Sequence, residues 1–172
     1  MIFSFIALYC IGLLNMSIRR LQNEYKQIYD ESNSIFSIDL KNLYRWDILL
    51  FGPQDTMYEG GIFKCEMTFP KDYPNKPPTF KFITKMLHPN VYPDGRMCIS
   101  ILHEGADEYN YESLGERWLP THSVTTIILS IASLLGNPNH DSAANIEASL
   151  EWRNDLPSYE KKIYRLVKDT QK

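Results

Sequence analysis

The stretch IFKCEMTFPKDYPNKPPTFKFI at residues 62–83 decides the fold class. In its first eight residues every second side chain is apolar: Phe63, Cys65, Met67 and Phe69. This period of two predicts a strand over 62–69 with one buried face, which makes Cys65 a core residue. Four prolines within 70–78 exclude a helix interior or a central strand, so this segment is a rigid connector. A short strand follows at 79–83.

Working outward from this stretch, the chain divides into a strand region and a helical region. Two further strands are predicted upstream, near 35–40 and 44–51, with a turn at GPQDT. Helical spacing of apolar residues predicts four helices: 17–31 (capped by Ser17), 123–135, 143–153 and 157–170. Short turns between consecutive strands favour an antiparallel meander. We therefore expect an α+β fold with an N-terminal helix, a four-stranded antiparallel meander sheet and three C-terminal helices.

Length and composition fit one ordinary globular domain. The chain has 172 residues, of which 44% are hydrophobic and 23% charged, and its formal net charge is −3. This balance argues against a strongly basic nucleic-acid binder, so we expect no nucleic-acid partner. Three widely spaced cysteines form no disulfide framework, which indicates a reducing, cytoplasmic compartment.

The first residues form a separate apolar extension. Residues 1–14 carry no charge, and the first charged residue is Arg19. A helix of this length falls short of the ~30 Å hydrocarbon core of a membrane. Three interpretations stay open: a gene-model artefact with translation starting at Met16, a marginal membrane anchor, or an apolar extension that packs on something. We accordingly divide the chain into an extension, 1–15, and a core domain, 16–172.

The irregular stretch 84–118 holds the candidate chemistry. A long segment without periodicity inside a compact domain is usually functional. Cys98 lies there, eight residues after Asn90, and a thiol near a neutral amide donor suggests acyl chemistry. The residues alone leave open a merely buried Cys98 and a cysteine protease with one of the histidines as base. A zinc site would draw on Cys65, Cys98, His88 and His103, but no pair has the usual ligand spacing, so we predict no metal.

A series of motifs favours one interpretation of Cys98 over the others. In chain order they are GPQDTMYEGG at 52–61, FPKDYPNKPP at 69–78, HPN at 88–90, GRMCISIL at 95–102, RWLP at 117–120 and NPNHDSAAN at 137–145. Together with the helix that begins SIRRLQNEYK, they make the chain resemble the ubiquitin-conjugating enzymes over about 155 residues, all but the apolar prefix. HPN followed after eight residues by a cysteine and then by Trp-x-Pro is a specific combination.

The resemblance implies an activity and partners. By this resemblance the protein is expected to accept ubiquitin from the activating enzyme as a Cys98 thioester and, with a RING-type ligase, to pass it to a lysine amine of a protein substrate or of ubiquitin. No cofactor is expected to bind, because ATP is used upstream by the activating enzyme. Two alternatives remain: a carrier for another ubiquitin-like modifier, and a non-catalytic ubiquitin-binding scaffold.

An insertion indicates which subclass of this family the chain resembles. Cys98 and Trp118 are twenty residues apart, and the acidic stretch HEGADEYNYESLGER lies between them. This insertion resembles that of the G-type conjugating enzymes, which are associated with chain building and with degradation at the endoplasmic reticulum. The resemblance implies proteasomal degradation as the purpose and the cytosolic face of that membrane as a location. Residues 1–15 would then supply a membrane contact.

The resemblance also assigns roles at the active site. Asn90 is expected to stabilise the oxyanion or to hold the active loop, and His88 and Pro89 to shape that loop. Many family members carry an acid at the position of Ser142, and this chain does not. We therefore expect neighbouring acids to orient or deprotonate the acceptor lysine: Asp141, Glu104, Asp107 and Glu108.

Partner surfaces follow from the same resemblance. Arg19 and Arg20 match the contact with the activating enzyme. Ligase contacts are expected from the first helix, the 69–78 loop and the pair Leu119 and Pro120. Asn75 stands where the family usually has a large apolar residue, so we expect an unusual ligase affinity or choice.

Overall fold

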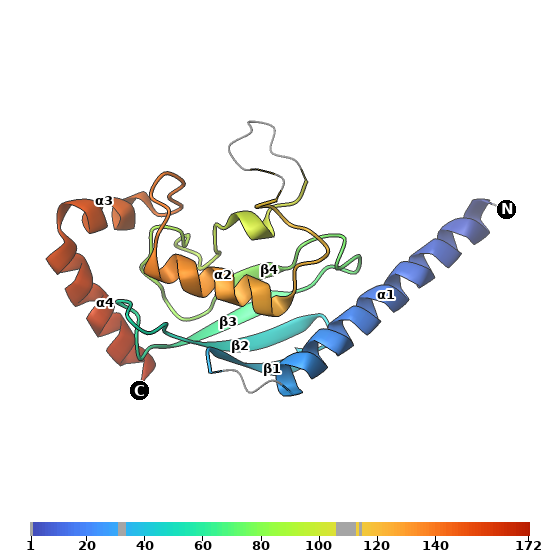
Figure 1. Cartoon of the computed structure of the whole chain (residues 1–172), viewed down its shortest axis with the longest axis horizontal. Helices are drawn as coiled ribbons and strands as arrows, with labels where there is room; N and C mark the ends of the chain where they lie inside the picture. The colour runs from blue at the N-terminus through green and yellow to red at the C-terminus, as the bar shows by residue number, and fades with distance from the viewer. Residues whose placement is uncertain (1, 31–33, 106–112, 114) are drawn as a thin grey trace.

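The computed structural model describes residues 2–30, 34–105, 113 and 115–172, and of residues 2–15 it describes the backbone only. Figure 1 shows the arrangement, a helix followed by a sheet, an irregular stretch and three helices. The elements are α1 (Ile2–Asp30), β1 (Phe36–Asn42), β2 (Arg45–Phe51), β3 (Ile62–Thr68), β4 (Thr79–Phe82), the 3-10 helix η1 (Ser100–Leu102), α2 (Val124–Gly136), α3 (Ile146–Asn154) and α4 (Leu156–Thr170). This is the predicted α+β class.

The four strands form one antiparallel sheet in the order β1-β2-β3-β4, which confirms the predicted meander. The register places Ile48 opposite Cys65, and Cys65 opposite Phe82. All three side chains are buried, so one face of the sheet carries the core. Cys65 is confirmed as a core residue, and burial raises the pKa of its thiol, which keeps the sulfur unreactive.

Helix α2 covers the apolar face of the sheet (Figure 1). It begins after Ser123, whose hydroxyl accepts a hydrogen bond from the backbone of Thr126, while the Thr126 side chain accepts one from the backbone of Ser123. This reciprocal cap satisfies two free donors at the helix start. Its inward residues are buried: Val124, Ile127, Ile128, Ile131 and Leu135. Each such side chain contributes about 1.5–3 kcal/mol to stability.

Helix α1 differs from its prediction at one end. The expected start at Ser17 is wrong, because α1 begins at Ile2 and Ser17 is fully buried within it. No proline interrupts residues 2–16, so the sequence holds no strong stop signal before Ser17. Leu21 is buried, as the predicted apolar face requires. Among helices whose side chains are described, none is long and apolar enough to cross a membrane.

The irregular stretch after β4 is held in place by the turn Pro93-Asp94-Gly95. Gly95 has φ +91°, and a Cβ there would lie 2.2 Å from the carbonyl oxygen of Phe82. Only glycine fits such a close approach with positive φ. The backbone N–H of Phe82 donates to the carbonyl of Gly95 at 2.9 Å, and a bridge pairs Val91 with Met97. The turn therefore presents the next residues at a fixed place beside the sheet.

The two C-terminal helices are present where they were predicted, although α3 begins at Ile146, three residues after the predicted start at 143, and α4 begins within one residue of its predicted start. Asn145 caps α3, and Asp155 caps α4 by accepting a hydrogen bond from the backbone of Ser158 at 3.1 Å. Pro157 lies in the first turn of α4, as predicted. The phenol of Tyr159 on α4 donates to the carbonyl of Leu87 at 2.9 Å. This bond joins α4 to the segment that leads into the HPN motif.

Candidate active site

Cys98 lies directly after the bridge between Val91 and Met97, on the return arm of the Pro-Asp-Gly turn. Its backbone N–H donates to the carbonyl of Asn90 at 2.9 Å, which places the two predicted catalytic residues side by side. The Cys98 side chain is half-buried, so it is held in place yet reachable. It lines a cleft of about 650 Å³. A positioned, accessible thiol is what nucleophilic acyl chemistry needs.

The Asn90 side chain is 1% exposed, and every hydrogen-bonding group of its amide is used inside the fold. Its Nδ2 donates to the carbonyl of Asn139 at 2.7 Å and to that of Ser142 at 3.0 Å. Its Oδ1 accepts from the backbone N–H of Asn139 at 2.9 Å. An amide has two hydrogens to donate, and here both are taken. Of the two expected roles, this geometry suits holding the 139–142 loop.

His88 is fully buried below the cleft, and both of its ring nitrogens are occupied. Nδ1 accepts from the backbone N–H of Asn90 at 3.0 Å, so Nε2 carries the proton and donates to the carbonyl of Leu134 at 3.0 Å. Burial lowers the pKa of His88 to about 4. The backbone carbonyl of Pro89 accepts from Asn145 at 2.8 Å. His88 is therefore a neutral support for Asn90, and neither ring nitrogen is free to act as a base.

Asp141 and Ser142 line the cleft opposite η1. Their backbone N–H groups both donate to Oδ1 of Asn139, at 3.0 and 3.3 Å, which shapes a tight turn at this wall. The Asp141 carboxylate is fully exposed and lies 3.8 Å from the guanidinium of Arg153. The structure thus brings one predicted acid to the nucleophile's cleft, on a wall that Asn90 holds.

The other predicted acids do not share that position. Asp107 and Glu108 lie outside the described residues. Glu104 lies 3.9 Å from Lys76 of the proline-rich connector, and it does not line the cleft. Glu116 does line it, and the sequence analysis missed this residue. Its place directly before Arg117 and Trp118, at the end of the insertion, was the available signal.

Tyr92 is a second residue that the sequence analysis missed. The turn that pairs Val91 with Met97 also brings the Tyr92 phenol next to Cys98. The electrostatic influence of the neighbouring Cys98 raises the pKa of Tyr92, and burial adds to this. Tyr92 is 38% exposed and stays protonated at neutral pH, so its hydroxyl is available as a donor beside the sulfur. Its position two residues after HPN, inside a tight turn, was the signal.

The cysteines and histidines named for a zinc site do not gather. Within the ranges that the structure describes, no group of three or more metal-ligating side chains occurs. Cys65 belongs to the core beneath the sheet face, whereas Cys98 and His103 line the cleft.

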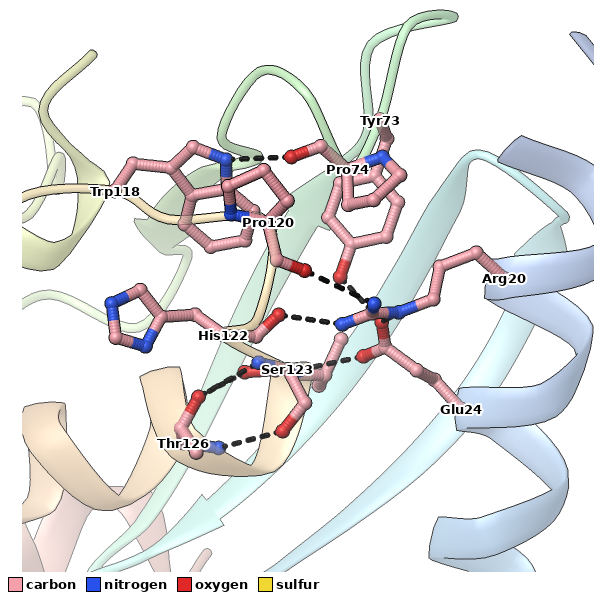
Figure 2. A network of polar contacts seen from close by, with 10 residues as sticks. Arg20, Glu24, Tyr73, Pro74, Trp118, Pro120, His122, Ser123 and Thr126 are labelled. Carbon is pink, nitrogen blue, oxygen red and sulfur yellow. Dashed lines mark hydrogen bonds and ion pairs between the residues drawn. The ribbon is translucent and has the colours of Figure 1, made fainter. Parts of the chain in front are cut away.

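A network of polar contacts, shown in Figure 2, ties α1 to two loops far along the chain. Arg20 donates to Glu24, to the carbonyl of Pro120 at 3.1 Å and to that of His122 at 2.7 Å. The Glu24 carboxylate, 6% exposed, also accepts from the Tyr73 hydroxyl at 2.6 Å and the backbone of Val124 at 2.7 Å. Three donors compensate for burial of its charge.

The same network places the predicted partner contacts together. Trp118 donates through its indole N–H to the carbonyl of Pro74 at 2.8 Å, joining the connector to the RWLP motif (Figure 2). The other predicted contact residues are exposed: Arg19, Asn75, Leu119 and Pro120. Arg20 is itself part-buried and held by the network. The network therefore joins the three chain segments that carry the predicted contacts.

Comparisons with known proteins agree with this geometry. The family model described as ubiquitin-conjugating enzyme matches residues 20–167. The chain is 48% identical to ubiquitin-conjugating enzyme E2 7 of Arabidopsis thaliana over 155 residues, which cover 88% of this chain and 93% of that one. It is 46% identical to ubiquitin-conjugating enzyme E2 15 of Schizosaccharomyces pombe (86% and 91% covered) and 44% identical to ubiquitin-conjugating enzyme E2 G2 of Homo sapiens (88% and 94% covered).

Proposed function

The chain belongs to the ubiquitin-conjugating enzyme family, and on that premise we propose that Cys98 is the residue that carries ubiquitin. The protein is a transferase that works through a cysteine thioester, with ubiquitin, an activating enzyme and a ligase as partners. The observation that supports Cys98 is its half-buried place in the cleft beside Asn90. Cys65, by contrast, is sealed in the core.

In the proposed loading step the Cys98 thiolate attacks the carbonyl carbon of the ubiquitin C-terminus, which arrives as a thioester on the activating enzyme. A new C–S bond forms, the old one breaks, and the activating enzyme's thiolate leaves. The chemistry draws on ATP only through the activating enzyme, so this chain needs no bound cofactor. A thioester keeps the acyl group reactive toward amines.

In the transfer step a neutral lysine amine attacks the Cys98 thioester. The C–N bond forms, the tetrahedral intermediate collapses, and the Cys98 thiolate leaves. The proton lost by the attacking amine passes to a carboxylate at the cleft, for which Asp141 is our candidate, and then to water. Asn90 acts by fixing the loop that carries Asp141, with His88 and Pro89 as supports. The hydroxyl of Tyr92 is placed to donate to charge that develops near the sulfur.

The finer parts of the proposal rest on the resemblance of the insertion to that of the G-type enzymes. They are chain building for proteasomal degradation, a RING-type ligase, and work at the cytosolic face of the endoplasmic reticulum. The identity with a relative named E2 G2 supports the subclass. Residues 1–15 are the segment that would give a membrane contact. Fractionation of full-length protein and of a chain that starts at Met16 tests the location, which is wrong if both remain cytosolic.

A charging assay with ubiquitin, activating enzyme and ATP tests the central step. We expect a ubiquitin adduct that reductant removes. Cys98→Ser should replace it with a reductant-stable ester or with nothing, whereas the matched variant Cys65→Ala should still form the thioester. An adduct that survives on Cys98→Ala would refute the assignment. No adduct on the intact protein would favour another ubiquitin-like modifier or a scaffold, and the assay would then be repeated with other modifiers and their activating enzymes.

A further inference from the structure

A second groove lies away from the cleft, between α4, the start of β3 and the segment 84–87. It has a volume of about 640 Å³ and shares no lining residue with the cleft. Figure 1 shows α4 at the end of the molecule where the C-terminus lies. The proposed transfer reaction uses none of the residues in this groove, so its composition needs a separate explanation.

Hydrogen bonds between elements hold the frame of the groove. The backbone N–H of Ile62 donates to the hydroxyl of Thr170 at 2.9 Å, which fixes the end of α4 to the start of β3. The backbone N–H of Lys64 donates to the hydroxyl of Thr84 at 2.8 Å, which fixes the opposite wall. Because both walls are joined to β3, the groove is preformed, and a ligand does not have to order it.

Positive charge is concentrated in this groove. Five of its lining residues are cationic: Lys64, Lys85, Lys162, Arg165 and Lys172. Among the described residues, Asp169 is the single acid that lines the groove. Glu151 pairs with Lys162 and Asp169 with Lys172. Within the described part of the chain, the other three cations have no carboxylate within ion-pair distance. This occurs in a protein whose net charge is −3, so the groove has a sign opposite to that of the whole molecule.

The floor of the groove is apolar. Ile62 is 39% exposed, and three further apolar side chains line the groove while half-buried: Met86, Leu87 and Leu166. No aromatic side chain lines it in the described structure. Binding of single-stranded nucleic acid usually relies on aromatic stacking, so an aliphatic floor suits a nucleic acid poorly. A peptide with carboxylates beside an aliphatic side chain complements both the rim and the floor.

We propose that this groove binds an acidic, leucine-containing segment of a partner protein. The aliphatic side chain lies against Leu87 and Leu166, and the carboxylates face Lys64, Lys85 and Arg165. The site is independent of the transfer chemistry, so a partner docked there leaves the cleft open.

Titration of the ¹⁵N-labelled protein with a short synthetic peptide that alternates Asp and Glu with Leu tests this inference. We expect saturable chemical-shift changes of the backbone amides of Met86, Leu166 and Thr170. Binding should weaken as the salt concentration rises, because the Debye screening length shortens. The double variant Lys85→Glu/Arg165→Glu should bind at least about tenfold more weakly. The matched variant Lys161→Glu changes an exposed cation of the same helix outside the groove and should bind as the wild type does.

Three results would overturn the proposal. The first is equal binding of a peptide in which Ser replaces every Leu, since the floor would then contribute nothing. The second is equal or tighter binding of an oligothymidylate, which would make the groove a general polyanion site. The third is a set of shifts that avoids the groove. The double variant and Lys161→Glu both alter exposed side chains that do not line the cleft. Unchanged loading with ubiquitin therefore shows that both proteins are folded.

Discussion

At the scale of single residues, Asn90 gives the sharpest prediction about the site. Its side chain makes three hydrogen bonds to the 139–142 loop and is buried. Asn90→Ala should therefore lower the free energy of unfolding by about 2–4 kcal/mol. It should also slow discharge of ubiquitin to free lysine more than it slows loading, because the loop with Asp141 loses its anchor. Urea unfolding and single-turnover discharge measure the two effects.

A matched control separates the two roles expected for Asn90. Ser142→Ala removes a neighbouring side chain and keeps the Ser142 carbonyl that Asn90 contacts. It should leave the stability of the protein nearly unchanged. If Asn90→Ala slowed discharge without any loss of stability, an oxyanion role would be favoured and the loop-holding role would be wrong.

His88 makes the stability of the protein depend on pH. Burial holds its pKa near 4, below the value of about 6.5 in an unfolded chain. A lowered histidine pKa means that the unfolded state binds the proton first, so stability is complete above pH 6.5 and falls toward pH 4. The loss should reach about 3 kcal/mol. Unfolding curves for wild type and His88→Gln between pH 7.5 and 4.5 measure it, and equal slopes in both proteins would contradict this explanation.

At the scale of elements, local sequence patterns predicted the strand and helix bounds that depend on residues close together in the sequence. Alternation predicted both ends of β3 to within a residue, and helical spacing predicted the starts of α2 and α4 to within a residue. The start of α1 was missed because a capping residue such as Ser17 is also tolerated within a helix, where its side chain can be buried. The partners of Asn90 lie about fifty residues away in sequence, and a single sequence carries no local signal for such a pairing.

The attachment of α1 to the loops yields a prediction at the same scale. Tyr73 donates to the buried Glu24 carboxylate, and burial raises the pKa of Tyr73, with the Glu24 charge adding to it. Tyr73→Phe should cost about 1.5–3 kcal/mol of unfolding free energy, since it removes a bond to a charged acceptor and leaves the ring in place. Urea denaturation measures this, with the exposed Tyr164→Phe as its control. A Tyr73→Phe protein as stable as the control variant would show that the network does not stabilise α1.

At the scale of the whole molecule, the two functional regions are built mainly from different parts of the fold and share Arg117, which lines the cleft and begins the RWLP segment. The cleft is lined by residues of the HPN turn, the stretch from Cys98 through η1 to His103, the 139–142 loop, and by Glu116, Arg117 and Leu134. The predicted partner surface is made by α1, the proline-rich connector and the RWLP segment, which the Glu24 network binds together (Figure 2). Motifs named most residues of both regions. They did not name Glu116, which lines the cleft, or Tyr92, because the places of both depend on how the irregular stretch folds back.

This separation predicts opposite effects from two exposed charges. Arg19→Glu should slow loading of ubiquitin, because an exposed rim charge acts on the rate of association with the activating enzyme, and the effect should shrink at high salt. Discharge from protein that already carries ubiquitin should not change.

Asp141→Asn should load with ubiquitin normally and discharge it to lysine about tenfold more slowly. Loss of a buried, fixed base would slow discharge ~10²-fold or more, and the smaller effect is expected because Asp141 is exposed. Raising the pH should restore its discharge, since more of the lysine is then neutral. Loading and discharge assayed separately for both variants decide the matter: if Asp141→Asn discharged as the wild type does at every pH, Glu116 would become the carboxylate to test, because it also lines the cleft.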